Sequence, residues 1–272
     1  MARLLIFSSI ASFWWHMACR PSQNSLCLSG SLDSSYLRHP CSVAAAKSEE
    51  GGHLGPGTGL LVVVEGNIGS GKSTVLHALA RMHAASGGVM VRQEPVDAPE
   101  WAALLALASS SPRRWAFTLQ VAVFVQMALR SRTCDVETER GRVWLEVAER
   151  DVHSALAFVR VGVEVGTLSD VEASTIKKLI LLHEQGGGRR PDVLVYLASP
   201  AEACLKRVRS RQRVGEESVS LEYLSALERA MLDQIHASRS GGMPVAVVDV
   251  GAKSVEAVAL ELYAICCRHK PV

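Results

Sequence analysis

The chain has 272 residues, of which 48% are hydrophobic, so it can form one α/β domain with a large core plus an extension. A net charge of +2 gives no electrostatic reason to expect nucleic acid as a partner. The seven cysteines are scattered and form neither a C-x-x-C pair nor a zinc-binding spacing. This distribution is typical of reduced thiols in an intracellular protein and excludes a disulfide framework.

Residues 1–57 differ in composition from the rest, and we treat them as a leader before a folded domain at 58–272. The only acid before Glu49 is Asp33, and the serine-rich leader carries four dispersed basic residues, Arg3, Arg20, Arg38 and Lys47. This pattern resembles an organelle transit peptide and favours a mitochondrial address. The glycine-rich stretch 51–57 indicates a linker, so the folded domain is expected to begin near Gly59.

Two other interpretations of the leader stay open. Leu4–Ala18 is largely apolar after Arg3, as in a signal peptide or anchor. Serines and a histidine interrupt this run, and it is short for a membrane span, so we expect no stable membrane insertion. Alternatively, the leader is a disordered extension without an address, which would leave the protein in the cytoplasm.

Residues 66–74 match the phosphate-binding loop pattern G-x-x-x-x-G-K-[ST]. The apolar run 60–64 before them predicts a buried parallel strand, and 75–82 predicts a helix, which is the setting that this loop requires. Glycines let backbone N–H groups approach phosphate oxygens, Lys72 can reach the β- and γ-phosphates, and the Ser73 hydroxyl can ligate Mg²⁺. The residues expected to bind ATP here are Gly66, Asn67, Ile68, Gly69, Ser70, Gly71, Lys72, Ser73 and Thr74.

Short apolar strands alternate with helices along the remaining chain. Further strands are predicted at 89–92, 143–147, 192–197 and 245–250. Helices are predicted at 101–107, 112–130, 152–161, 169–185, 200–213, 221–238 and 254–266, with Ser169 and Glu172 as a capping box. Hairpin signals are absent from the sequence, so the connections are crossovers. The predicted fold is therefore an α/β P-loop kinase fold with a five-stranded parallel sheet flanked by helices.

Charged residues follow two of these strands where parallel sheets bind ligands, beyond the carboxyl ends. Glu94 follows 89–92, and Glu149 and Arg150 follow 143–147. By spacing alone, Glu94 is equally well explained as a surface-loop carboxylate. Gln120 lies within the apolar helix 112–130 and is either a ligand contact or a core amide with its own partners.

Arginines recur at 207, 209, 211 and 213, close to Glu216 and Glu217. A solvated helix end and a nucleic-acid-binding segment are the alternatives to a lid. The lid interpretation is favoured because arginines can close over triphosphate charge, and one guanidinium can lie on a purine ring. A lid also excludes water from the γ-phosphate during transfer.

Taken together, these segments resemble the deoxynucleoside kinases, which include thymidine, deoxycytidine, deoxyguanosine and broad-specificity enzymes. The resemblance rests on the segments 64–68, 94–96, 117–120, 149–150 and 220–224 and on the arginine lid, in that order. It covers about Leu60 to the C-terminus and leaves the leader outside. It implies transfer of the γ-phosphoryl group of ATP, with Mg²⁺, to the 5′-hydroxyl of a deoxynucleoside, and a homodimer built from the Phe117 and Val152 helices.

The resemblance also implies a role for each matching residue. Glu94 would be the general base, Arg150 would hold the hydroxyl and the base in line, and Glu149 would help place Mg²⁺. Gln120 would pair with the nucleobase, and Glu216 would bind the sugar 3′-hydroxyl. Further expected contacts are Trp101 with the substrate, Arg211 and Arg213 with phosphates, and Arg207 with adenine.

Met127 and Ala155 fall where family members differ by substrate. An Arg/Asp pair there narrows the pocket, whereas Met and Ala leave room for a 5-methyl group, so thymidine or other pyrimidine deoxynucleosides are expected substrates. Three residues depart from the family pattern, which are Asp151 for a usual serine, Ser109 for a tyrosine and Val159 for a phenylalanine, and the segment between Glu94 and Trp101 is longer than usual.

Two alternative functions are kept. A thymidylate-type nucleoside monophosphate kinase would share the loop, the lid and the parallel sheet. A non-catalytic family member serving as a subunit of a mitochondrial complex would suit the leader. That second alternative usually involves a damaged loop or a lost base, whereas Lys72, Ser73, Glu94 and Arg150 are all present.

Overall fold

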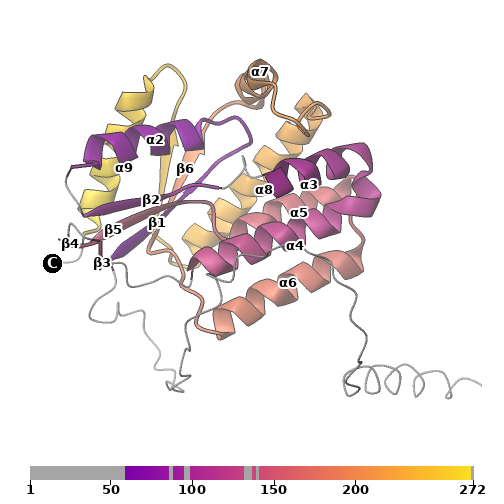
Figure 1. Cartoon of the computed structure of the whole chain (residues 1–272), viewed down its shortest axis with the longest axis horizontal. Coiled ribbons are helices and arrows are strands. Elements are labelled where there is room, and N and C mark those ends of the chain that lie inside the picture. Colours follow the sequence, from indigo (N-terminus) through magenta and orange to yellow (C-terminus); the bar gives the residue numbers. More distant parts are fainter. Residues whose placement is uncertain (1–58, 86–87, 95–98, 132–136, 139–140, 271–272) are drawn as a thin grey trace, which may run out of the picture. The chain divides into compact units, whose positions relative to one another are not determined.

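A computed structural model describes residues 59–85, 88–94, 99–131, 137–138 and 141–270. Its main sheet has five parallel strands in the order β2-β5-β1-β6-β7 (Figure 1). The strands are β1 (Leu60–Glu65), β2 (Val89–Arg92), β5 (Leu145–Glu149), β6 (Val193–Ala198) and β7 (Val245–Asp249). The five-stranded parallel sheet predicted from the sequence is confirmed.

Helices cover both faces of this sheet (Figure 1). One face is covered by α2 (Lys72–His83) and α9 (Val255–Arg268), and the other by α5 (Ala155–Glu164) and α8 (Leu221–Ser240). Successive β1 residues alternate between the two cores, with Val62 and Val64 facing the first and Leu61 and Val63 the second. Because both faces are covered, the whole of β1 is buried, as its uninterrupted apolar sequence predicted.

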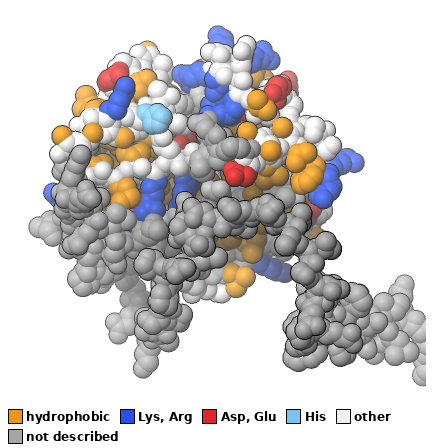
Figure 2. All heavy atoms as spheres, viewed as in Figure 1, with side chains coloured by type: hydrophobic (Ala, Val, Ile, Leu, Met, Phe, Trp, Pro, Cys, Tyr) orange, Lys and Arg blue, Asp and Glu red, His pale blue; other side chains and the backbone are white. Residues whose placement is uncertain are grey.

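The remaining helices extend the second face. They are α3 (Pro99–Ser110), α4 (Pro112–Ser131), α6 (Asp170–Gln185) and α7 (Ala201–Arg211), the last leading into the predicted lid. Ser169 and Glu172 form the predicted capping box at the start of α6. Figure 2 shows basic side chains gathered over α7 at the top of this face. No described helix is long and apolar enough to span a membrane.

The structure corrects three sequence predictions. A short antiparallel hairpin joins β3 (Glu137–Thr138) to β4 (Gly141–Arg142), although we detected no hairpin signal. Strand β5 starts two residues later than predicted because it is paired in register with β1, from Leu145 opposite Leu60 to Glu149 opposite Val64. The helix predicted from Val152 begins instead with a 3₁₀ turn, η2 (Val152–Ser154). The Asp151 carboxylate caps this turn by accepting hydrogen bonds from the N–H groups of His153 and Ser154.

Several predictions concern parts of the chain outside the described residues. These are the leader at 1–57 with its linker, and Pro95 and Val96 after Glu94.

Candidate active site

The phosphate-binding loop leaves the carboxyl end of β1 and enters α2 at Lys72. Gly69 adopts a φ of 80°, and a Cβ there would lie 2.5 Å from the Cys204 carbonyl oxygen, so only glycine fits. The Asn67 side chain donates to the Leu224 carbonyl at 2.9 Å, which anchors the loop to α8. Ile68, Gly69 and residues 71–74 of the predicted loop line the pocket described below.

Lys72 and Ser73 take the positions that phosphate chemistry requires. The Lys72 Nζ donates to the carbonyl oxygens of Gly66 and Asn67, each at 2.9 Å. Burial, together with the nearby Arg150, lowers the pKa of Lys72 to about 8. The Ser73 hydroxyl donates to Glu149 Oε1 at 2.9 Å, so a hydroxyl and a carboxylate oxygen lie side by side at the mouth of the loop.

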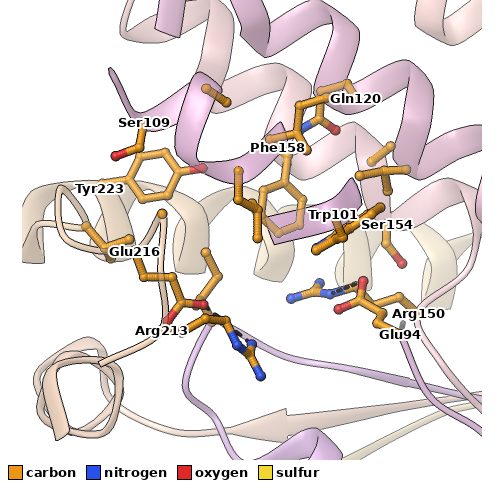
Figure 3. A pocket seen from close by; sticks show the side chains of 18 of the residues that line it. Glu94, Trp101, Ser109, Gln120, Arg150, Ser154, Phe158, Arg213, Glu216 and Tyr223 are labelled. Atoms are coloured by element: carbon orange, nitrogen blue, oxygen red, sulfur yellow. Dashed lines mark ion pairs between the residues drawn. The ribbon is translucent and has the colours of Figure 1, made fainter. Parts of the chain in front are cut away.

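Arg150 is the centre of the charged cluster at the carboxyl ends of β1, β2 and β5. Its backbone adopts a φ of 61°, which is uncommon for a residue with a side chain. Its Nε lies 3.4 Å from Glu94 Oε1, and its guanidinium carbon lies 4.9 Å from the Phe158 ring centroid (Figure 3). Burial works against its charge, but the carboxylates of Glu94, Glu65 and Glu149 outweigh it and raise the pKa of Arg150.

A cavity of about 590 Å³ adjoins this cluster and brings together residues from the phosphate loop to α8. The structure places all the predicted nucleoside contacts along its wall, namely Glu94, Trp101, Gln120, Met127, Arg150, Ala155 and Glu216. Gln120 projects from α4, and its buried Oε1 has no hydrogen-bond partner among the described residues (Figure 3). A buried amide oxygen without a partner is costly, which argues against the alternative of a satisfied core amide.

The three departures from the family pattern have different structural consequences. Val159 is buried in the core beside Met127 and Ala155, while the neighbouring Phe158 lines the cavity, so an aromatic ring is present there. Asp151 lies outside the cavity lining and caps η2. Ser109 is at the cavity wall, where its hydroxyl lies 2.9 Å from that of Ser218.

The lid arginines are held by the carboxylate predicted to bind the sugar. Arg211 makes two hydrogen bonds to Glu216, at 2.8 and 2.6 Å, and Arg213 lies 3.6 Å from the same carboxylate (Figure 3). Arg207 instead donates to the Gly69 carbonyl at 3.1 Å and to the Ser199 hydroxyl at 2.8 Å, beside the phosphate loop. Its contact with adenine stays a prediction.

Sequence reasoning missed four residues at this site. Tyr223 lines the cavity next to Ser109, and burial raises the pKa of its phenol to about 12 (Figure 3). Ser154 also lines the cavity, and Arg130 donates to the Gln93 carbonyl at 2.6 Å, which ties α4 to the end of β2. The fourth is Glu65, whose available signal was an acid at the end of an otherwise apolar strand.

A P-loop beside a cavity lined by apolar and polar side chains, with a carboxylate and an arginine at their junction, defines the class of a small-molecule kinase. A family model described as deoxynucleoside kinase matches residues 62–261. The chain therefore belongs to the deoxynucleoside kinase family, and it is a kinase that phosphorylates nucleosides. The family resemblance, the fold and the enzyme class inferred from the sequence are confirmed.

Individual relatives agree with this assignment. The thymidine kinase of Ictalurid herpesvirus 1 (strain Auburn) is 33% identical over 220 residues, which cover 78% of this chain and 88% of the viral protein. The mitochondrial thymidine kinase 2 of Homo sapiens is 30% identical over 173 residues, or 61% of each chain. A solved deoxyadenosine kinase from M. mycoides, with dCMP and a flexible dCDP bound, has a TM-score of 0.62 at 16% identity. It covers 78% of this chain and 100% of its own, which supports the fold.

Proposed function

We propose that this kinase transfers the γ-phosphoryl group of ATP to the 5′-hydroxyl of a deoxynucleoside, with pyrimidines such as thymidine among its substrates, in nucleotide salvage. One observation carries the proposal. Gln120, whose Oε1 has no partner among the described residues, and the Glu94–Arg150 pair line the same cavity, and Lys72 and Ser73 line it too. A nucleoside that pairs its base with Gln120 can present its hydroxyl to Glu94.

Proton transfer and charge neutralisation are divided among the residues of the cluster. Glu94 accepts the proton of the 5′-hydroxyl, and Arg150, 3.4 Å from it, holds the carboxylate and the hydroxyl in line. Lys72 and the backbone N–H groups of the loop neutralise the triphosphate, and Arg211 and Arg213 add charge from the lid. Little covalent help is needed because phosphoryl transfer depends mainly on positioning and electrostatics.

Ser73 and Glu149 are the residues that would hold Mg²⁺ together with the triphosphate. Their oxygens are 2.9 Å apart, and hydroxyl and carboxylate oxygens are the ligand types that Mg²⁺ takes. When bound, Mg²⁺ neutralises charge developing on the β- and γ-phosphate oxygens. Among the described residues no group of three or more His, Cys, Asp or Glu is placed to hold a metal ion.

The first experiment measures ATP-dependent phosphorylation of the four deoxynucleosides and of thymidylate. Wild type is compared with Glu94→Gln and with Glu100→Gln, an exposed control on α3. Activity on a pyrimidine nucleoside that falls by about 10²–10⁴ in Glu94→Gln alone supports the proposal and Glu94 as base. Activity on thymidylate alone favours the monophosphate kinase, and inactivity of a folded wild type with every acceptor favours the non-catalytic alternative.

Pyrimidine preference is supported by two small or flexible side chains. Met127 and Ala155 both line the cavity, and both are almost fully buried, so their volume sets the space around the base. The double variant Met127→Arg with Ala155→Asp should lose activity on thymidine relative to deoxycytidine, because the larger side chains fill the space for a 5-methyl group. Wild-type activity restricted to purines would contradict this assignment.

We also propose a homodimer, through the expected Phe117 helix, α4, together with α6 in place of the expected helix that follows Val152. The apolar residues of the segment from Val152 are packed in the core, and its exposed positions include the charged Arg160 and Glu164. Exposed apolar side chains lie instead on α4 and α6, at Val125, Leu129, Leu181 and Leu182. Leu129→Glu with Leu182→Glu should convert a dimer to a monomer in sedimentation equilibrium, whereas a wild-type monomer would rule the dimer out.

The mitochondrial address remains a proposal carried by the composition of residues 1–57. Fusion of these residues to a fluorescent protein tests it directly. Diffuse cytoplasmic fluorescence would favour the cytoplasmic alternative, and membrane or secretory fluorescence would favour the signal anchor.

A further inference from the structure

The geometry points to Glu65 as a positioning residue for this kinase, one that acts through Arg150 and does not touch the substrate. Glu65 ends β1 directly before the phosphate loop and is 7% exposed. It does not line the cavity, unlike Arg150 and Ser154 beside it. The inference rests on the proposed role of Arg150 in aligning Glu94 with the substrate hydroxyl.

Both carboxylate oxygens of Glu65 are occupied by residues that face the cavity. Its Oε2 accepts from Arg150 Nη1 at 3.1 Å. Its Oε1 accepts a short hydrogen bond from the Ser154 hydroxyl, and that hydroxyl accepts from the Asp151 N–H at 2.9 Å. A carboxylate that is buried outside the cavity lining and bonded on both oxygens does not reach the substrate, but it can fix the orientation of its partners.

Glu65 completes a three-point attachment of the Arg150 guanidinium. Nη1 binds Glu65, Nη2 donates to the Gly66 carbonyl at 3.1 Å, and Nε lies 3.4 Å from Glu94. A guanidinium has five N–H groups, so one N–H on each terminal nitrogen remains for substrate or phosphate oxygens. Glu65 and Gly66 thus hold the side of the guanidinium that faces away from Glu94.

Arg150 needs this restraint because several carboxylates compete for it. Glu94 and Glu149 both attract its charge, and the backbone at Arg150 is held in the left-handed region by an N–H bond to the Val64 carbonyl at 3.2 Å. Strained backbone persists where the surroundings over-determine it. Without Glu65, the guanidinium would turn toward Glu94 and pair more closely with the base that must accept the substrate proton.

The test compares Glu65→Gln with Glu146→Gln. Glu146 is a matched control because it is also a buried β-strand carboxylate bound to arginine, 2.7 Å from Arg92 Nε and 3.4 Å from Arg189 Nη1. It lies at the start of β5, away from the cavity lining. We expect Glu65→Gln to lower kcat about 10- to 100-fold with the KM for ATP nearly unchanged, since misplacement by about 1 Å has effects of this size. Glu146→Gln should retain kcat.

A double-mutant cycle with Arg150→Lys then separates positioning from general stability. If Glu65 acts through Arg150, Glu65→Gln will lower kcat no further in the Arg150→Lys background. Equal effects of Glu65→Gln in both backgrounds, or equal kcat losses in Glu65→Gln and Glu146→Gln, would overturn the inference. If Glu65→Gln does not fold, Glu65→Asp, which keeps the charge on a shorter side chain, replaces it in the same cycle.

The assay uses whichever deoxynucleoside the wild type phosphorylates. Wild-type activity with an unchanged Glu65→Gln kcat therefore refutes the role of Glu65 and leaves the proposed function standing. Inactivity of the wild type with every nucleoside refutes both.

Discussion

The two carboxylates of β5 have opposite surroundings only three residues apart. Glu146 is bound by Arg92 and Arg189, so positive charge surrounds it from two sides. Glu149 accepts from the Ser73 hydroxyl at 2.9 Å and weakly from the Glu94 N–H at 3.4 Å; the charges of Lys72 and Arg150 act on it, but it forms no ion pair among the described residues. Glu146, which two arginines bind, stabilises the sheet, whereas Glu149 can still bind a ligand.

The same contrast extends across the two ends of the sheet. Near the amino ends of the strands, Arg189 also binds Asp192, so these charges are neutralised within the protein. At the carboxyl ends, the Gln120 oxygen has no partner and the Tyr223 phenol faces the cavity. At this end of the sheet polar groups therefore remain available to a ligand.

The largest expected effect comes from removing the negative charge of Glu149. Glu149→Gln should lower kcat by about 10²–10³, since one electrostatic contact made in the transition state is worth this much. The folded protein should lose little stability, as judged by urea unfolding. Raising Mg²⁺ should recover part of the activity, and a variant as active as wild type would show that Glu149 is not a metal ligand.

The second prediction concerns Glu146, the carboxylate that is paired with two arginines. Glu146→Gln should lower the free energy of unfolding by about 3 kcal/mol, because Arg92 and Arg189 lose a buried charge partner. Its kcat should stay near the wild-type value at temperatures where the protein is folded. If Glu146→Gln lost kcat without losing stability, Glu146 would not be the structural counterpart of Glu149.

A smaller effect is expected at the cavity wall. Ser109 stands where a tyrosine is usual in the family. Tyr223 lies next to Ser109 on the cavity wall, and its phenol is placed to replace the hydroxyl of that tyrosine. Tyr223→Phe should raise the KM for the nucleoside about tenfold, the equivalent of one hydrogen bond of about 1.4 kcal/mol, with kcat for bound substrate nearly unchanged. Addition of Ser109→Tyr should restore the lower KM if the two positions are interchangeable.

An effect of similar size to that of Tyr223 is expected on stability, and it depends on pH. His153 lies 2.8 Å from Asp151 and 3.0 Å from Glu184. Burial opposes its charge, but these two carboxylates outweigh burial and raise the pKa of His153 to about 9. A raised histidine pKa stabilises the folded state fully below about pH 6.5, and this stability is lost as pH rises through 9.

The free energy of unfolding of His153→Gln should therefore be about 1–2 kcal/mol lower than that of wild type at pH 6 and nearly equal to it at pH 10. Urea unfolding at both values measures this difference. A constant difference between the two proteins at all pH values would mean that His153 contributes by packing and not by charge.

The sequence predicted most of the fold because its signals are local. The unbroken apolar run of β1, the glycine pattern after it and the capping box at Ser169 each depend on neighbouring residues. The exact start of β5 and the β3–β4 hairpin were not predicted, because strand pairing determines them and pairing partners lie far apart in the chain.

By itself, the sequence determined the reaction class, since the loop at 66–74, Glu94, Arg150 and Gln120 are recognised by residue type and order. Only the tertiary structure decided which polar groups have partners. It showed that Gln120 has an unpartnered oxygen, that Phe158 and not Val159 faces the cavity, and that Glu65 is bound on both oxygens. Satisfaction of a buried polar group depends on neighbours distant in sequence, so residue order cannot reveal it.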